Sequence, residues 1–284
     1  MTDLTRAARV AIITGAGGMR GIGRGIALRL ARDGYDLTLV DIRRAPDQTP
    51  PDELRAGWRG IESVAGEIGG LGRRALCCHA DIRDSAAVQS VVDQTLATFG
   101  RIDLLVNNAR AIIGEKFHVV DLDESEWDRV LDVNLKGTFL CSRAVARHFL
   151  KEQRPGRIVN IGSSAGKRGS AGDAAYSSSK FAITGFTQSL ALELASAGIT
   201  VNAVCPGLVD SGRFSLRAQH AAQRAGVSQE DFERERIEQL GSAVPTGRAA
   251  VPEDVAALVA FLASAEAGHI TGQSINVNGG ELMH

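Results

Sequence analysis

A tyrosine and a lysine lie four positions apart near the start of an expected helix, in Tyr176-Ser-Ser-Ser-Lys180. Positions i and i+4 share one helix face, so the phenol and the ammonium are neighbours. A free tyrosine has a pKa of about 10, which suits proton transfer at neutral pH poorly, and a nearby cation lowers that pKa. The pair therefore predicts general acid/base chemistry by Tyr176. This spacing is common on helices, so the surrounding motifs must show whether the pair is catalytic.

A glycine-rich segment, Thr14-Gly-Ala-Gly-Gly-Met-Arg-Gly-Ile-Gly23, supplies part of that context. It follows the apolar run Val10–Ile13 and precedes the helical pattern Ile22–Arg32. Between a strand and a helix, small residues let the backbone approach a pyrophosphate, and the helix start offers free N–H groups and a positive dipole end. This position favours a dinucleotide site over a tight turn that binds nothing.

Asp41 ends the second apolar run, 18 residues after Gly23. A carboxylate there accepts hydrogen bonds from both adenosine ribose hydroxyls and repels a 2′-phosphate, so Asp41 predicts NAD rather than NADP. Arg20 in the loop and the pair Arg43-Arg44 after the run argue the other way, because arginines pair with phosphates. Simple capping of the strand end is the alternative role for Asp41.

Short apolar runs and helical patterns alternate along the whole chain. Strands are expected at 10–13, 37–40, 75–78, 104–106, 158–161, 199–204 and 274–277, and the main helices at 22–32, 85–99, 125–150, 174–197 and 252–264. Ser85 is the expected N-cap of the second of these helices. Alternation of this kind favours βαβ units. We therefore expect one Rossmann-type domain over residues 1–284, a doubly wound three-layer α/β/α fold with a seven-stranded parallel sheet.

The segment 44–60 interrupts this alternation. It holds three of the seven prolines and has little apolar periodicity, so we expect an exposed insertion. It flanks the adenosine end of the predicted dinucleotide site, where it would affect cofactor access or a partner contact more than chemistry.

Composition excludes several classes of protein. The net charge is −1, from 32 basic and 33 acidic residues without clustering, so no field would recruit nucleic acid or anionic lipid. No apolar run reaches the ~18 residues of a membrane span, and the run Val255–Ala265 reads as a buried helix. Four cysteines without a Cys-x-x-Cys pair indicate reduced thiols in a cytoplasmic protein, and the histidines show no metal-ligand spacing.

Taken together, the motifs make the chain resemble the short-chain dehydrogenase/reductase family over nearly its whole length. They occur in the family's order: the glycine loop, Asp81-Ile82, Asn107-Asn108-Ala109, Asn134, Ser163, Tyr176, Lys180, Pro206-Gly207 and the tail Ile270–Gly280. Ser163 precedes Tyr176 by thirteen residues, as the family's serine does, and Ser164 is the less favoured neighbour. The resemblance implies hydride transfer between NAD and a secondary alcohol or its ketone.

The resemblance also implies roles for single residues. Tyr176 would exchange the proton of the substrate hydroxyl, and Lys180 would lower its pKa and hold the nicotinamide ribose. Ser163 would bind the substrate oxygen, and Asn134 would hold a water that relays protons from Lys180. Asp81 would accept from the adenine amino group, and Asn107 and Ala109 would line the cofactor. The implied cofactor-binding set is Gly15, Gly17, Arg20, Gly21, Ile22, Gly23, Asp41, Ile42, Asp81, Ile82, Asn108, Ala109, Tyr176, Lys180, Pro206, Gly207, Val209 and Ser211.

Three departures from the family's pattern bear on these roles. The glycine loop is two residues longer than usual, so either Gly15 or Gly17 takes the first role. Arg110 stands where the family usually has glycine, and a residue with a Cβ resists a positive φ, so the turn there should differ. Ser211 replaces the usual threonine and keeps its hydroxyl.

The resemblance leaves substrate and assembly open. Residues 207–245 would form the substrate lid, and the family is usually tetrameric, with a dimer as the alternative. Arg110, Lys167 and Arg213 near the pocket mouth would recognise an anionic group on the substrate, although solvated surface cations are the commoner case.

Other functions also remain open. An NADPH-dependent ketoreductase of the oxoacyl-carrier-protein reductase type shares everything but Asp41. A non-catalytic NAD-binding scaffold would lose the four catalytic positions, and all four are filled here. A sugar-nucleotide epimerase would need a longer C-terminal region.

Overall fold

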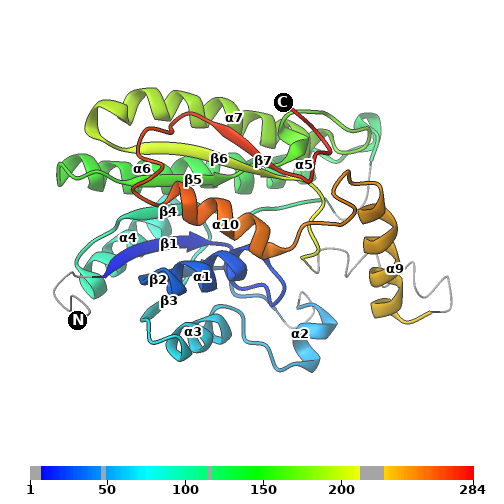
Figure 1. Cartoon of the computed structure of the whole chain (residues 1–284), viewed down its shortest axis with the longest axis horizontal. Helices are drawn as coiled ribbons and strands as arrows, with labels where there is room; N and C mark the ends of the chain where they lie inside the picture. The colour runs from blue at the N-terminus through cyan, green and yellow to red at the C-terminus, as the bar shows by residue number, and fades with distance from the viewer. Residues whose placement is uncertain (1–7, 46–48, 114–116, 212–226) are drawn as a thin grey trace.

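The computed structural model describes residues 8–45, 49–113, 117–211 and 227–284. Figure 1 shows a central sheet with helices on both sides. Its seven strands pair in parallel in the order β3-β2-β1-β4-β5-β6-β7. They are β1 (Arg9–Thr14), β2 (Tyr35–Asp41), β3 (Ala75–His79), β4 (Leu104–Asn107), β5 (Arg157–Ile161), β6 (Thr200–Pro206) and β7 (Ser274–Val277). The predicted doubly wound, seven-stranded α/β fold is therefore confirmed.

Helices cover both faces of this sheet (Figure 1). The buried clusters place α1, α3 and α10 on one face and α4, α6 and α7 on the other. The helices are α1 (Ile22–Arg32), α2 (Pro51–Arg55), α3 (Ile61–Gly70), α4 (Ser85–Phe99), α5 (Glu124–Leu131), α6 (Thr138–Lys151), α7 (Ala174–Leu194), α9 (Gln229–Ser242) and α10 (Pro252–Leu262). Ser85 is the first residue of α4 and not its N-cap, because the Asp84 side chain accepts the N–H of Ala86.

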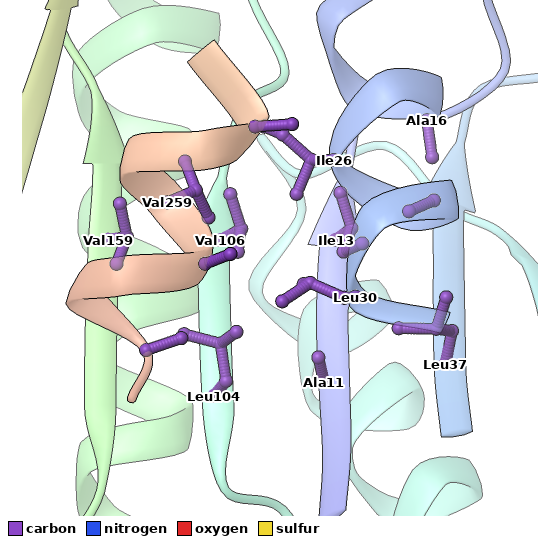
Figure 2. Packing of buried hydrophobic residues seen from close by; sticks show 14 of the residues in the cluster. Ala11, Ile13, Ala16, Ile26, Leu30, Leu37, Leu104, Val106, Val159 and Val259 are labelled. Carbon is purple, nitrogen blue, oxygen red and sulfur yellow. The ribbon is translucent and has the colours of Figure 1, made fainter. Parts of the chain in front are cut away.

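The strands are apolar along their length because both faces of the sheet are buried. Successive side chains of β1 alternate between two clusters: Ala11 and Ile13 pack on one face and Ile12 on the other. Figure 2 shows Leu30 of α1 and Val259 of α10 in the first of these clusters. A parallel sheet covered on both faces is thus the source of the continuous apolar runs in the sequence.

The expected long helix over 125–150 is interrupted, so this expectation is wrong in detail. Helix α5 ends at Leu131, a π-helical turn spans Asp132–Gly137, and α6 continues from Thr138. The Asn134 amide binds the backbone of Ala111, with distances of 2.7 Å and 3.0 Å, and the backbone carbonyl of Asn134 accepts the Thr138 hydroxyl. Such π-turns occur frequently at functional sites, and this one brings an amide from a helix to the loop after β4.

The carboxyl ends of five neighbouring strands meet at one edge of the sheet. They end in Thr14, Asp41, Asn107, Ile161 and Pro206. The strand order reverses between β1 and β4, and open α/β sheets bind ligands beside such a switch point. The fold therefore gathers the predicted site residues at the edge where a dinucleotide would bind.

Asp36 on β2 is a buried carboxylate that links two strands. It is 1% exposed and accepts the backbone N–H of Arg74 and the guanidinium groups of Arg73 and Arg74, at 2.6–3.0 Å. Burial alone would raise the pKa of this carboxyl, but the bonds and charges of the two arginines outweigh burial and hold the pKa below its ordinary value of 3.8. The charged form of Asp36 therefore stabilises the folded state.

We expect Asp36→Asn to lower the free energy of unfolding by about 2 kcal/mol at pH 7, because hydrogen bonds to a buried charged group are lost. A carboxyl whose pKa is depressed by folding stabilises the protein above its ordinary pKa, and this contribution is lost as pH falls through the folded-state pKa. Urea unfolding at pH 7 and near pH 3 measures both effects. A difference between variant and parent that does not shrink at the lower pH would contradict this account.

Candidate active site

The glycine loop forms a close-packed cradle of backbone at the end of β1. Gly15 has a φ of +67°, and a Cβ there would lie 2.6 Å from the Ala109 Cα. A Cβ on Gly23 would lie 2.4 Å from the Gly15 carbonyl oxygen. Gly17 instead donates its N–H to Asp41 Oδ2 at 2.7 Å. Gly15 therefore makes the sharp turn, and Gly17 faces the carboxylate at the end of β2.

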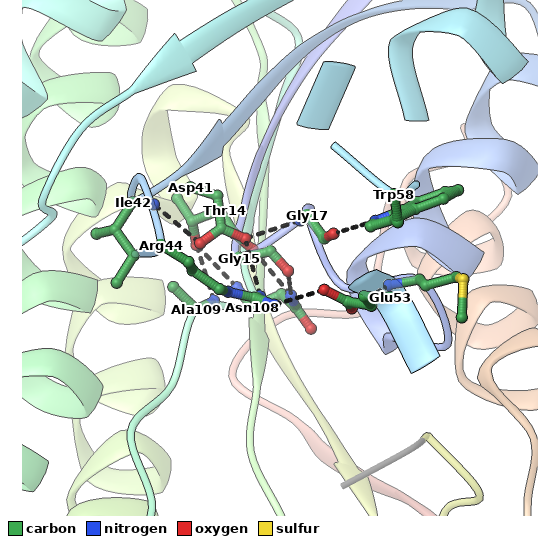
Figure 3. Close-up of polar contacts among 11 residues, drawn as sticks. Thr14, Gly15, Gly17, Asp41, Ile42, Arg44, Glu53, Trp58, Asn108 and Ala109 are labelled. Carbon is green, nitrogen blue, oxygen red and sulfur yellow. Dashed lines mark hydrogen bonds and ion pairs between the residues drawn. The ribbon is translucent and has the colours of Figure 1, made fainter. Parts of the chain in front are cut away.

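The loop is tied to the chain after β4 by Thr14 and Asn108 (Figure 3). The Asn108 amide donates to the carbonyl oxygens of Thr14 and Gly15 at 2.9 Å and 2.8 Å. The Thr14 hydroxyl accepts the N–H groups of Asn108 and Ala109, both at 3.0 Å. Contrary to expectation, Asn107 does not line the large cavity at this edge of the sheet. Its buried amide donates to Ser142 and Asn160 instead. The two adjacent asparagines therefore have separate structural tasks.

A cavity of about 600 Å³ runs along this edge of the sheet. This volume lies in the range of small-molecule and cofactor sites. The cavity brings together twelve of the predicted cofactor residues: Gly15, Arg20, Gly21, Ile22, Gly23, Asp41, Ile42, Asp81, Ile82, Asn108, Ala109 and Ser211. The glycine cradle beside the start of α1 fits a pyrophosphate, since a side chain at Gly15 or Gly23 would fill the space.

Asp41 and Asp81 line the end of this cavity that an adenosine would occupy. Asp41 accepts backbone N–H groups on both oxygens, from Gly17 and from Ile42. Each carboxylate oxygen has a second lone pair for a ribose hydroxyl. Asp81 also lines the cavity, and its carboxylate binds Arg83 through the backbone N–H and the guanidinium. The hydrogen bond from Arg83 holds the pKa of Asp81 below its ordinary value, despite partial burial.

Three of the four predicted catalytic residues lie beside this cavity. Ser163, Tyr176 and Lys180 line a smaller pocket with Pro206, Gly207 and Val209. This pocket shares Ile22, Asn108, Arg110 and Ser211 with the large cavity, so the two lie side by side.

Within the smaller pocket, the cation lies beside the phenol. Lys180 is 3% exposed, donates from Nζ to the Ile161 carbonyl at 2.7 Å and lies 5.8 Å from the centre of the Tyr176 ring. Ser163 Oγ accepts the N–H of Ala165 at 3.1 Å. Ser164, the less favoured serine, instead contacts Asn278.

Asn134 is not among the residues that line this pocket. Its amide nitrogen donates to Ser179 Oγ and to the Ala111 carbonyl, both at 3.0 Å. Asn134 therefore connects α7 to the loop after β4, and its expected part in a proton relay stays a prediction.

A model of the family described as short chain dehydrogenase matches residues 9–221. The chain belongs to the short-chain dehydrogenase/reductase family. It is accordingly an oxidoreductase that acts on alcohol or keto groups with a nicotinamide cofactor.

Relatives in this family match nearly the full chain. Subunit BbsD of (2S)-((R)-hydroxy(phenyl)methyl)succinyl-CoA dehydrogenase from Thauera aromatica is 40% identical and covers 97% of both chains. A 3-oxoacyl-acyl-carrier-protein reductase from a Synechocystis strain is 39% identical and covers 100% of both. Among solved structures, an actinorhodin polyketide ketoreductase with NADPH superposes with a TM-score of 0.81, at 34% identity over 96% of this chain and 97% of the other. These relatives differ in substrate, so family membership leaves the substrate open.

The structure explains two departures from the short-chain dehydrogenase/reductase pattern. Arg110 is not among the described residues with a positive φ, so the turn after Ala109 accommodates its Cβ without strain. The lengthened glycine loop carries Arg20, which pairs with Asp210 after β6 at 2.5 Å. Arg20 thus spans the cavity between the glycine loop and the chain after β6.

Of the three cations expected at the pocket mouth, only Arg110 is seen to line the site, in both the large cavity and the catalytic pocket. Lys167 donates to the Ser274 carbonyl on β7 at 2.7 Å and lines neither. Arg213 lies outside the described residues, as does the whole of 212–226 within the expected lid over 207–245.

Sequence reasoning missed the contribution of segment 44–60. The segment is exposed at Leu54, as expected, but Glu53 is only 6% exposed. Glu53 accepts the N–H of Met19 at 2.8 Å, and Trp58 donates its indole N–H to the Gly17 carbonyl at 2.7 Å (Figure 3). No periodicity or motif in the segment marks either residue. Both support the glycine loop from the side opposite Asn108.

Two features are absent from the described part of the chain. No group of three or more His, Cys, Asp or Glu side chains is arranged to hold a metal ion there. Within the same ranges, no helix has the length and apolar character needed to span a membrane.

Proposed function

We propose that this enzyme transfers a hydride between NAD and a secondary alcohol or its ketone, with Tyr176 as the general acid/base. The observation that carries the proposal is that the cavity lined by Asp41 lies directly beside the pocket lined by Tyr176, Lys180 and Ser163, with four lining residues in common. A cofactor held at Asp41 and the glycine loop would extend towards the phenol. When bound, the nicotinamide supplies the hydride chemistry.

The side chains of the smaller pocket supply the proton chemistry in this proposal. Tyr176 would move a proton to or from the substrate oxygen, and the ammonium of Lys180 would stabilise its phenolate. The bond from Lys180 to the Ile161 carbonyl supports this role, because it fixes the cation beside the ring. Ser163 would donate its hydroxyl proton to the substrate oxygen while its Oγ accepts from Ala165.

Asp41 would select NAD in this proposal. We expect Asp41→Ala to raise the Kd for NADH about tenfold, because bonds from the ribose to a charged acceptor are lost, while the Kd for NADPH does not rise. Fluorescence titration of both cofactors measures the effect without any substrate. An unchanged Kd for NADH would remove Asp41 from the cofactor site.

A second candidate is an NADPH-dependent ketoreductase. It is favoured by Arg44, which lies 3.9 Å from Asp41 Oδ2, and by relatives that include 3-oxoacyl-acyl-carrier-protein reductases. The experiment that separates the candidates is an initial-rate screen of secondary alcohols, polyols, hydroxy acids and hydroxysteroids with NAD and with NADP. Turnover with NADP alone would favour the second candidate. Tight NADH binding without any turnover would favour a non-catalytic scaffold.

The partners in this proposal are a small-molecule substrate and further copies of the same chain, with residues 207–245 as the substrate lid. Exposed apolar side chains on α6 and α7 support a homotetramer or dimer, because they would be covered by a second copy. They are Phe139 at 40%, Phe181 at 46% and Leu192 at 84% exposure. Neither nucleic acid nor membrane is part of the proposal, and we place the enzyme in the cytoplasm.

A further inference from the structure

A buried carboxylate from outside the dinucleotide motif reaches the adenosine end of the cavity. Glu53 comes from α2, and its side chain is 8% exposed. One oxygen accepts the N–H of Met19 in the glycine loop at 2.8 Å, and the other accepts from Arg44 Nη1 at 3.1 Å. Figure 3 shows Glu53 and Arg44 beside Asp41 and Gly17. Glu53 thus contacts both the glycine loop and Arg44.

Arg44 lies between two carboxylates at this point. Its guanidinium is 3.1 Å from Glu53 Oε2 and 3.9 Å from Asp41 Oδ2. All three side chains line the 600 Å³ cavity and also an adjoining pocket of about 240 Å³. The group of three carries a formal charge of −1, although Arg43 and Arg59 also line the adjoining pocket. A 2′-phosphate entering here would compete with Glu53 for Arg44.

Such competition for Arg44 would destabilise the folded protein. Moving Arg44 to a phosphate would leave the buried Glu53 carboxylate without its cation, and an unpaired buried charge is strongly destabilising. Burial already raises the pKa of Glu53, against the opposing effects of the Met19 N–H and Arg44. The charged carboxylate therefore depends on these two partners.

We propose that Glu53 is a specificity-determining residue for the cofactor: it holds Arg44 away from a 2′-phosphate and supports the lengthened glycine loop through Met19. The proposal rests on the nicotinamide cofactor of the proposed function and adds a second carboxylate to Asp41. It assigns a task to the 44–60 segment, which lies outside the strand, loop and helix of the dinucleotide motif.

The test replaces Glu53 with glutamine, which keeps an acceptor for Met19 but removes the charge that holds Arg44. Fluorescence titration of NADH and of NADPH, without substrate, gives the ratio of the two Kd values. We expect Glu53→Gln to bind NADPH about tenfold more tightly and NADH within about twofold of the parent. An unchanged ratio would overturn the proposal.

Two further variants make this result specific. In Glu53→Gln combined with Arg44→Ala, the gain in NADPH affinity should disappear, and a gain that persists would contradict the role given to Arg44. Glu67→Gln on α3 is the matched control, because Glu67 pairs with Arg24 at 2.6 Å and lines neither pocket. It should leave the ratio unchanged, and a shift equal to that of Glu53→Gln would overturn the proposal.

A third variant tests whether Glu53 supports the glycine loop. Glu53→Ala removes the acceptor for Met19 as well as the charge, so NADH binding should weaken in this variant and not in Glu53→Gln. Equal NADH affinities in the two variants would contradict the loop-supporting role.

The role of Glu53 can be tested independently of the proposed NAD dependence. A parent protein that prefers NADPH would refute the proposed NAD dependence, yet Glu53→Gln would still shift the ratio if Glu53 acts as we propose.

Discussion

Tyr176→Phe should lower kcat by about a thousandfold, while the Kd for NADH changes by less than about threefold. The substitution removes only the hydroxyl, and the ring of Tyr176, which is 9% exposed, keeps its packing. Lys180 and Ser163 remain, but neither replaces a phenol as the group that exchanges a proton at the substrate oxygen. Steady-state rates with a substrate found in the screen and a fluorescence titration with NADH measure the two quantities separately.

Ser177→Ala is the matched control for this loss. Ser177 is the next residue on α7, is 6% exposed and lines neither the large cavity nor the catalytic pocket. Its hydroxyl can be removed without touching the proposed chemistry, so kcat should stay within about twofold. Full activity in Tyr176→Phe, or an equal loss in Ser177→Ala, would show that the acid/base is not Tyr176.

Gly23→Ala should weaken NADH binding by at least about a hundredfold, since close backbone approach is what the loop provides. The added Cβ would lie 2.4 Å from the Gly15 carbonyl oxygen and 2.6 Å from the Asn108 amide nitrogen. Neither contact is tolerable, so the loop must move away from Asn108 and the cradle is lost. Titration with NADH measures the binding, and circular dichroism checks that the sheet and helices are retained.

Gly66→Ala tests whether this effect belongs to the site. Gly66 lies within α3, and a Cβ there meets nothing within 4 Å. Alanine also favours the helix, by about 1 kcal/mol over glycine. Gly66→Ala should therefore bind NADH like the parent and be at least as stable. A Gly23→Ala protein that binds NADH normally would show that the loop does not hold the pyrophosphate.

Much of the fold could be predicted because its signals are local. The apolar runs of β1, β4 and β5 each identify a strand buried on both faces, and the helical patterns between them require a parallel order. The placement of Tyr176 beside Lys180 also follows from local geometry, since four residues make about one helical turn. Asp41 and the glycine loop were identifiable because Asp41 ends one strand and the loop directly follows another.

Other features depend on partners far away in the chain and have no local signal. Met19 and Glu53 are 34 residues apart, and Asn134 lies 23 residues from Ala111. The π-turn that carries Asn134 gives no break in helical periodicity, so the sequence predicted one continuous helix. Asn107 and Asn108 are adjacent and identical, and only their surroundings direct one to Ser142 and the other to Thr14.

The sequence by itself therefore determined the parallel sheet, the family resemblance and the spacing of the residues that would do the chemistry, because periodicity and i,i+4 geometry act over a few residues. Only the tertiary structure decided which backbone and side-chain groups line the cavity beside the glycine loop. Glu53, Trp58 and Arg44 gain their significance from the glycine loop folding against segment 44–60. Hydrogen bonds and charges between distant segments depend on distance in space, which the order of residues does not express.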